Sequence, residues 1–269
     1  MDKPIKRSRL RLWCGRVYYT CKRYAFWLFG GVRFAKQSER ILPCTCFTHG
    51  TPLLRKLKDV DMYLQYNKIV NLKLARGKVN LLTLRPGETF SYWYAIGKPT
   101  KRKGYLKGMI LHNGTFKAGT GGGLCQLSNL IFWMAAHTPL TIVERHRHGY
   151  DVFPDADRTQ PFGSGATCFY NYGDLMLRND TERTYQLSVE VTDDALRGAW
   201  LCDTQPDYTY EVYEKDHIMR RELWGGYSRH NLIYRRKLDP AGAVVADEFV
   251  VENHAVMMYQ PFITARAEV

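Results

Sequence analysis

Hydrophobic side chains recur at helical spacing through the first part of the chain. In residues 1–40 this pattern predicts one or two helices that end near residue 30. Residues 41–52 contain two prolines and a glycine, which predicts a connector. Residues 53–76 again present apolar positions on one helical face, and Gly77 follows as the expected helix end. The N-terminal part is therefore predicted to be helical.

A central helix is predicted to begin at Cys125. Apolar residues at positions 127, 130, 131 and 134 have the spacing of one buried helical face, and the pattern stops near Pro139. Ahead of it, two alternating segments flank Asn113-Gly114, the dipeptide typical of a tight β-hairpin. The chain therefore leads from a hairpin through a glycine-rich loop into the helix.

Beyond the central helix, short alternating segments predict strands almost throughout. They cover residues 141–148, 166–172, 175–178, 185–191, 197–202, 208–213, 232–236, 244–251 and 255–259. N-terminal helices, a central helix starting near Cys125 and a mainly antiparallel β-sheet after it indicate an α+β fold. We predict a basic amphipathic N-terminal arm (1–52), a core domain (53–205) and a β-rich C-terminal extension packed on the core (206–269).

The positive charge is concentrated in the N-terminal arm. The chain has 39 Lys and Arg against 26 Asp and Glu, a net charge of +13, and residues 1–40 contribute eleven of the cations against Asp2 and Glu39. Because Trp13, Tyr18 and other apolar residues alternate with these cations, the arm is expected to contact an anionic membrane surface. An aromatic stripe that docks on the core is the alternative. No nucleic-acid motif accompanies the charge, so nucleic acid is not an expected partner.

The seven cysteines indicate free thiols in a reducing compartment, because their number is odd and their spacing fits no disulfide framework. The longest apolar run, residues 25–32, is too short to span a membrane, and no secretory signal is visible. We therefore expect a cytoplasmic protein, peripheral at the inner face of the membrane if the arm binds lipid. No cofactor is expected.

One glycine-rich stretch, residues 119–129, carries the most suggestive chemistry. It delivers Cys125 to the first turn of the predicted helix, where backbone N–H groups and the helix dipole favour a thiolate. Gln126 is expected to support the site. The residues expected to shape a substrate site, where missing side chains allow close approach, are Gly121, Gly122, Gly123 and Asn129.

Candidate bases follow after the helix. On an extended strand, Glu144, His146 and His148 would share one face. Either histidine would serve to deprotonate Cys125. The carboxylates expected to orient that histidine are Glu144, Asp155 and Asp157. Alternatively, Cys125 and the two histidines are three zinc ligands, or the histidines only form structural hydrogen bonds; the sequence leaves these alternatives open.

Several motifs together resemble the VanW family. They are residues 86–91, 113–114, 121–129, 138–146, 172–175 and 178–181. They occur in the family's order and spacing from about residue 70 to about residue 202. The resemblance implies an association with the cell envelope or with glycopeptide (vancomycin) resistance, and it implies no particular reaction.

One position departs from the family pattern. Many members have an aspartate two residues before the threonine that corresponds to Thr167, where this chain has Gly165. If that aspartate orients a histidine, the residues that would have to replace it here are Asp151, Asp155 and Asp157.

Two functional hypotheses follow. In the first, the protein is an enzyme with Cys125 as nucleophile and His146 or His148 as base, acting in acyl or peptide chemistry on a substrate related to the cell wall. In the second, it is a non-catalytic protein that binds an anionic cell-wall precursor, a peptide or a partner at the membrane surface. The basic loop 98–107 is a candidate to receive such an anion.

Overall fold

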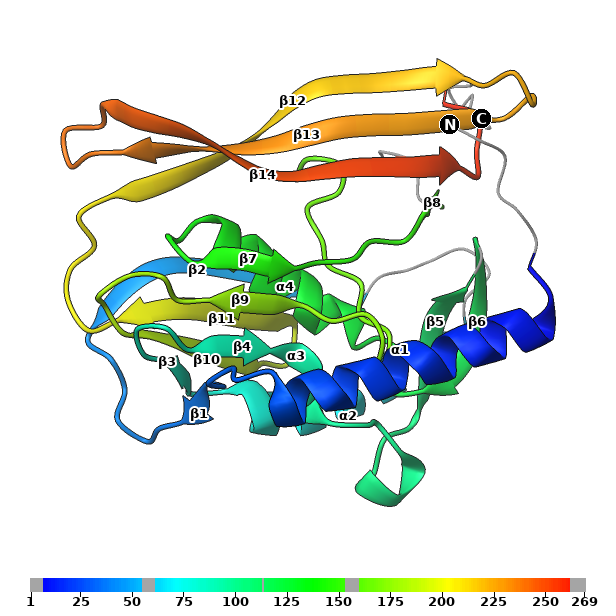
Figure 1. The fold of residues 1–269 in the computed structure, drawn as a ribbon, viewed down its shortest axis with the longest axis horizontal. Coiled ribbons are helices and arrows are strands. Elements are labelled where there is room, and N and C mark those ends of the chain that lie inside the picture. Colours follow the sequence, from blue (N-terminus) through cyan, green and yellow to red (C-terminus); the bar gives the residue numbers. More distant parts are fainter. Residues whose placement is uncertain (1–6, 55–60, 113, 153–159, 262–269) are drawn as a thin grey trace.

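The computed structural model describes residues 7–54, 61–112, 114–152 and 160–261, and its fold is α+β, as predicted (Figure 1). The helices in these residues are α1 (Arg9–Phe29), α2 (Met62–Val79), α3 (Tyr92–Ile96), the 3-10 helix η1 (Lys101–Lys103) and α4 (Cys125–Ala136). The strands are β1 (Lys36–Gln37), β2 (Cys44–Pro52), β3 (Leu82–Leu84), β4 (Thr89–Ser91), β5 (Lys107–His112), β6 (Thr115–Thr120), β7 (Thr141–Glu144), β8 (Tyr150–Asp151), β9 (Met176–Arg178), β10 (Tyr185–Val191), β11 (Ala195–Cys202), β12 (Thr209–Arg221), β13 (Tyr227–Leu238) and β14 (Val244–Met257).

The core is built on an antiparallel sheet with the strand order β1-β3-β10-β11-β2. The two strands predicted over 185–191 and 197–202 are confirmed as β10 and β11, which pair with Tyr185 opposite Cys202. Helices α2 and α4 pack against this sheet, and Leu127 of α4 is fully buried. A Cβ on Gly198 of β11 would lie 2.7 Å from the Met134 side chain. The glycine therefore lets α4 approach the sheet closely.

Two smaller sheets complete the core. One has the order β4-β9-β7, and the other is the β5-β6 hairpin. The hairpin predicted around Asn113-Gly114 is confirmed by the antiparallel register that places His112 opposite Thr115, although residue 113 lies outside the described part of the chain. The turn between β3 and β4 has Gly87 at φ 74°, as its sequence predicts.

The last part of the chain forms a further sheet, which lies as a layer above the core in Figure 1. Its strand order is β12-β13-β14-β8, and β8 runs parallel to β14. β14 is one continuous strand where the sequence predicted two. On the buried face, Asn231 donates a hydrogen bond to the Phe162 carbonyl at 2.7 Å. Polar side chains thus link this sheet to the segment that follows β8.

Helix α1 runs along the outside of the core (Figure 1). Ser8 caps it by accepting a hydrogen bond from the Arg11 N–H, and it ends at Gly30, as predicted. None of its residues is fully buried. Within the described residues, no helix combines the length and the apolar character that crossing a membrane requires.

The prediction of a connector over residues 41–52 is wrong. Residues Cys44–Pro52 form β2, an edge strand paired with β11. Gly50 and Pro52 are tolerated there because one side of an edge strand makes no ladder hydrogen bonds. The predicted boundaries between regions, at residues 52 and 205, stay predictions.

Two strand predictions after α4 need correction. The strand predicted over 141–148 is confirmed only for residues 141–144, where β7 lies, and residues 166–172 form no regular strand. The Ser128 hydroxyl donates to the Ala166 carbonyl at 2.6 Å, and the Asn129 side-chain oxygen accepts from the Ala166 N–H at 2.8 Å. Side chains of α4 therefore occupy backbone groups that a strand would need for its ladder.

Candidate functional site

The glycine-rich loop crosses the backbone of β5 at very short range. A Cβ on Gly122 would lie 2.1 Å from the carbonyl carbon of Gly108. A Cβ on Gly123 would lie 2.2 Å from the Lys68 side chain. Gly121 and Gly123 also have positive φ values of 75° and 89°. Packing therefore requires glycine here, and a role in shaping a substrate site stays a prediction.

Asn71 of α2 holds this loop in place, and the sequence analysis missed it. It is fully buried, and its amide donates to the Leu106 and Gly122 carbonyls at 3.1 and 2.9 Å. Its side-chain oxygen accepts from the Leu106 N–H at 2.8 Å. One asparagine thus ties α2, the start of β5 and the glycine-rich loop together.

Cys125 is the first residue of α4, as predicted. The residue is half-buried, and burial raises the pKa of its thiol against the opposing effect of the backbone N–H groups of Cys168 and of Cys125 itself. Burial also raises the pKa of the neighbouring Cys168 thiol well above its ordinary value. Burial of the thiol therefore opposes the stabilised thiolate that the sequence analysis expected, and the catalytic role of Cys125 stays a prediction.

The predicted neighbours of Cys125 make structural hydrogen bonds. Gln126 donates to the Thr51 hydroxyl and to the Pro52 carbonyl, both at 2.9 Å, and so ties α4 to β2. Asn129 holds Ala166, and a Cβ on Gly165 would lie 2.6 Å from the Asn129 side-chain oxygen. Without movement of Asn129, the position has no room for the aspartate of the family pattern.

Glu144 is the centre of a polar cluster between α1 and the core. Its carboxylate accepts two hydrogen bonds from the Arg23 guanidinium, at 2.5 and 2.7 Å. It also lies 2.8 Å from Nε2 of His146 and accepts from the Asp174 N–H at 2.9 Å. Arg23 belongs to the arm that the sequence analysis expected to face lipid, so its contact with the core was missed.

The two acids of this cluster differ in pKa. Burial raises the pKa of Glu144, but hydrogen bonds from His146 and Arg23 outweigh burial and leave the net pKa below its ordinary value. Asp174 is fully buried, and burial raises its pKa to about 6 despite hydrogen bonds from Ser91 and the Trp93 N–H. Asp174 accepts these hydrogen bonds at the start of α3, so its carboxylate has a structural role there.

The two candidate histidines have different surroundings. His146 is exposed and bound to Glu144, whereas His148 packs edge-on against Phe169 with ring centroids 5.7 Å apart. Burial and a nearby arginine lower the pKa of His148 to about 4. Among the described residues, no hydrogen bond joins either histidine to Cys125. Glu144 and His146 are thus brought together, and the catalytic roles stay predictions.

The predicted zinc ligands do not form a cluster, and of the candidate orienting aspartates only Asp151 lies within the described residues. In the part of the chain that the structure describes, Cys125 and the two histidines do not gather their ligand atoms within 4.8 Å of one another. Asp155 and Asp157 lie outside the described residues. Asp151 is buried in β8, where it pairs with Arg229 at 3.4 Å and accepts from the Tyr259 hydroxyl at 2.9 Å.

A hollow of about 540 Å³ opens beside α3. Lys78 and Lys103 give it positive charge, and Tyr94 and Tyr105 give it aromatic surface. The ring of Trp27 in α1 lies 5.5 Å from that of Tyr94, so α1 packs against one residue of the lining. The complete lining is Leu74, Lys78, Tyr94, Ala95, Ile96, Gly97, Lys103 and Tyr105.

Helix α1 presents two different faces. Arg23 and Trp27 face the core. The opposite face is uncharged and exposed, since residues three or four positions apart lie on one side of a helix. Leu10 is 70% exposed and Leu28 is 73% exposed. The residues of this face, called the α1 stripe below, are Leu10, Cys14, Val17, Cys21 and Leu28. Tyr24 lies at its edge, where its hydroxyl is 2.5 Å from that of Tyr170 in the core.

Comparison with known proteins decides the family. A family profile described as "VanW like protein" matches residues 67–201. The chain belongs to the VanW family. It is 38% identical to Vancomycin B-type resistance protein VanW of Enterococcus faecalis (strain ATCC 700802 / V583) over 205 residues, which are 76% of this chain and 74% of that protein.

A second relative is less similar. Uncharacterized protein YoaR of Bacillus subtilis (strain 168) is 33% identical over 104 residues, 38% of this chain and 34% of that protein. No solved structure matches the chain significantly. The VanW profile includes the glycine-rich loop, α4 and Glu144, whereas α1 and strands β12 to β14 lie outside it.

Proposed function

We propose that this VanW protein is a non-catalytic binding protein of the cell envelope, which works at an anionic membrane surface and takes an anionic wall precursor or peptide. The observation that carries the proposal is the two-faced helix α1, held to the core by Arg23 and exposing the α1 stripe. The relative from Enterococcus faecalis is named for B-type vancomycin resistance. We extend that association to this chain as part of the proposal.

The chemistry of α1 favours lipid as the occupant of the stripe. Arg11 and Lys22 border it, and Trp13 and Tyr18 beside it are 61% and 62% exposed. Amphipathic aromatic rings suit the headgroup region, and each nearby cation contributes about 1 kcal/mol at an anionic surface. An uncharged stripe between cations thus suits a helix lying in the plane of an anionic leaflet.

The basic aromatic hollow supplies the second part of the proposal. Lys78 and Lys103 offer two cations to a phosphate or carboxylate, and Tyr94 and Tyr105 offer rings to an apolar or sugar portion. Trp27, on the core-facing side of α1, packs against Tyr94 of this lining, so the helix connects the hollow with the proposed lipid surface on its other side. The seven cysteines without disulfides suit the cytoplasmic, reducing side of that membrane.

Vesicle binding tests the membrane part of the proposal. The full chain is mixed with vesicles of phosphatidylcholine alone or with phosphatidylglycerol added, and co-sedimentation is measured at low and high salt. We expect binding to the anionic vesicles that weakens with salt. Replacing Leu10 and Leu28 by Ser should weaken it about tenfold or more, since each buried leucine contributes roughly 1.5–3 kcal/mol.

The vesicle experiment has a matched control variant, and two results would contradict the membrane part of the proposal. Leu223→Ser removes a fully exposed leucine from the turn between β12 and β13, outside the proposed surface, and should leave vesicle binding unchanged. Equal binding to neutral and anionic vesicles would contradict the proposal. So would self-association of the chain that the same double substitution of the stripe abolishes, because the stripe would then bind a second helix.

The cysteine enzyme is the competing function, and alkylation distinguishes it. A raised thiol pKa predicts that Cys125 reacts with iodoacetamide at neutral pH more slowly than Cys14 and Cys21, which are exposed on α1. Mass spectrometry of timed samples measures the three rates. A Cys125 rate above the other two, or loss of ligand binding in a folded Cys125→Ala variant, would favour the enzyme.

A further inference from the structure

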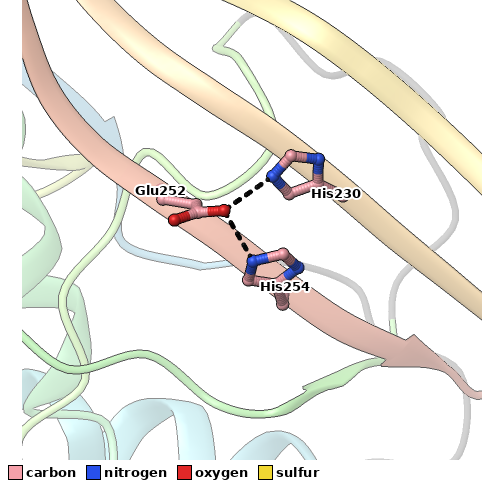
Figure 2. A group of neighbouring side chains, drawn as sticks. All are labelled: His230, Glu252 and His254. Atoms are coloured by element: carbon pink, nitrogen blue, oxygen red, sulfur yellow. Dashed lines mark hydrogen bonds and ion pairs between the residues drawn. The ribbon is translucent and has the colours of Figure 1, made fainter. Parts of the chain in front are cut away.

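Two histidines and a glutamate gather on the exposed face of the C-terminal sheet (Figure 2). His230 of β13 lies directly opposite His254 of β14. Glu252 precedes His254 by two residues on the same strand, so both side chains leave the same face. Asn231 and Asn253, one position along each strand, are buried on the opposite face. The strand register alone therefore creates the triangle that Figure 2 shows.

The geometry of this His-Glu-His cluster is close to that of a metal site. Nε2 of His230 and Nε2 of His254 lie 3.0 and 2.8 Å from the same Oε1 atom of Glu252. All three ligand atoms lie within 4.8 Å of one another. Tetrahedral zinc with bonds of about 2.0–2.2 Å separates its ligand atoms by roughly 3.3–3.5 Å. Small side-chain movements would thus bring the three atoms into coordination distance.

The protonation state of the cluster also suits a cation. A carboxylate only accepts, so both Nε2 atoms must carry protons that they donate to Glu252. An arriving divalent ion would displace the two Nε2 protons and meet an ionised carboxylate. Imidazole nitrogens favour zinc-like ions over magnesium and calcium.

We propose that His230, Glu252 and His254 bind one divalent transition-metal ion of the zinc type, with a fourth position open to water or an anionic ligand. A hollow of about 360 Å³ adjoins the two histidines and leaves room for that position. Arg220 and Glu222 also line it, and their charges offset each other. The site lies outside the residues that match the VanW profile and is independent of the proposed membrane function.

Calorimetric titration of the full, chelator-treated chain with Zn²⁺ tests the site. We expect one ion per chain at this site, with binding weakened at lower pH because protons compete for the imidazole nitrogens. His254→Ala should weaken binding by at least the roughly 10–100-fold that loss of an outer-shell partner costs elsewhere. Glu252→Gln preserves shape and removes the charge, so it should weaken binding without disturbing the fold. Glu211→Gln, an exposed glutamate of β12, is the matched control and should bind as the unmodified chain does.

X-ray absorption of the zinc-loaded chain separates this site from the seven thiols. We expect nitrogen and oxygen neighbours at about 2.0–2.2 Å, whereas thiolate ligands would add sulfur at about 2.3 Å. Sulfur in the coordination shell would overturn the proposal. So would the absence of binding, or an affinity that His254→Ala and Glu252→Gln leave unchanged.

Discussion

At the scale of single residues, Cys125 illustrates how burial overrides a local signal. A helix N-terminus stabilises an anion by about 0.3–1 kcal/mol, which is less than one pKa unit of 1.36 kcal/mol. Burial shifts a pKa by up to about 3–5 units in the opposite direction. The thiol at the start of α4 therefore has a raised pKa although the helix begins at the predicted residue.

A second single residue, His137, should make the stability of the protein depend on pH. It stacks on Phe47 with ring centroids 3.8 Å apart, and burial lowers its pKa from 6.5 to about 4. A histidine with a lowered folded-state pKa binds its proton more readily in the unfolded chain, so stability is lost as pH falls from about 6.5 toward about 4. In the His137→Phe variant, which keeps a ring on Phe47, we expect the free energy of unfolding to fall on acidification by about 1–3 kcal/mol less than in the unmodified chain.

Urea unfolding of both proteins at pH 7 and at pH 4.5 measures this difference. His148 has a similarly lowered pKa, so the variant should retain part of the acid sensitivity. If the free energy of unfolding fell as much between pH 7 and pH 4.5 in His137→Phe as in the unmodified chain, His137 would not contribute to the acid sensitivity.

At the scale of elements, close backbone contacts decide where the glycines matter. Helix α2 continues through Gly77 to Val79, although the sequence predicted its end at Gly77. An added Cβ at Gly77 meets no atom within 4 Å. At Gly122 it would overlap the Gly108 backbone. Replacing glycine by alanine is therefore expected to have opposite effects on stability at Gly77 and at Gly122.

Gly122→Ala should destabilise the protein by about 3 kcal/mol or more, because neither backbone segment has a flexible side chain that can move away. Gly77→Ala is the matched control and should stabilise it by up to about 1 kcal/mol through helix propensity. Denaturant unfolding of the two variants gives both values. A Gly122→Ala variant as stable as the unmodified chain would contradict the close crossing of the loop and β5.

The docking of α1 rests on a partly buried ion pair. The side chains of Arg23 and Glu144 are 11% and 22% exposed. A double-mutant cycle of Arg23→Met and Glu144→Gln should therefore give a coupling of about 1–2 kcal/mol, above that of a surface pair. Arg16→Met, at an exposed position of the same helix, should have little effect. A coupling near zero, with unchanged proteolysis of α1 in Arg23→Met, would show that the pair does not hold the helix.

At the scale of the whole molecule, the half-buried Arg145 connects the core to the C-terminal sheet. Arg145 donates to the carbonyls of Gly163 and Gly165, the latter at 2.8 Å, and to the Asn253 side chain at 2.7 Å. Its guanidinium also lies over the Phe132 ring of α4, 5.1 Å from the centroid. Burial lowers its pKa to about 9, so it still carries its charge at neutral pH.

Asn253→Ala should lower the free energy of unfolding by about 2 kcal/mol, because it leaves the half-buried Arg145 cation without one acceptor. Hydrogen exchange should accelerate in β14 as well. Val245→Ala, at an exposed position of β14, serves as the control and should change neither quantity appreciably. Exchange in β14 that Asn253→Ala leaves unchanged would show that this contact does not couple the sheet to the core.

The sequence determined the local elements and the family. Helical spacing located α1 and α4, Asn113-Gly114 located the β5-β6 hairpin, and alternation located β10 and β11. These features depend on residues close together in the chain, so periodicity and turn chemistry are sufficient to predict them. The VanW motifs likewise lie within continuous segments, and the profile match confirms them.

Only the tertiary structure decided what the candidate residues contact. Most of the segment predicted as a connector is strand β2, because β11, which is distant in sequence, pairs with it. Arg23 of the N-terminal arm contacts Glu144 of the core, and the Asn129 side chain accepts a hydrogen bond from the Ala166 backbone. Hydration, ion pairs and buried hydrogen bonds depend on which distant segments meet, and hydrophobic periodicity carries no information about that. For the same reason the His230–Glu252–His254 triangle arises from strand register and has no continuous motif in the sequence.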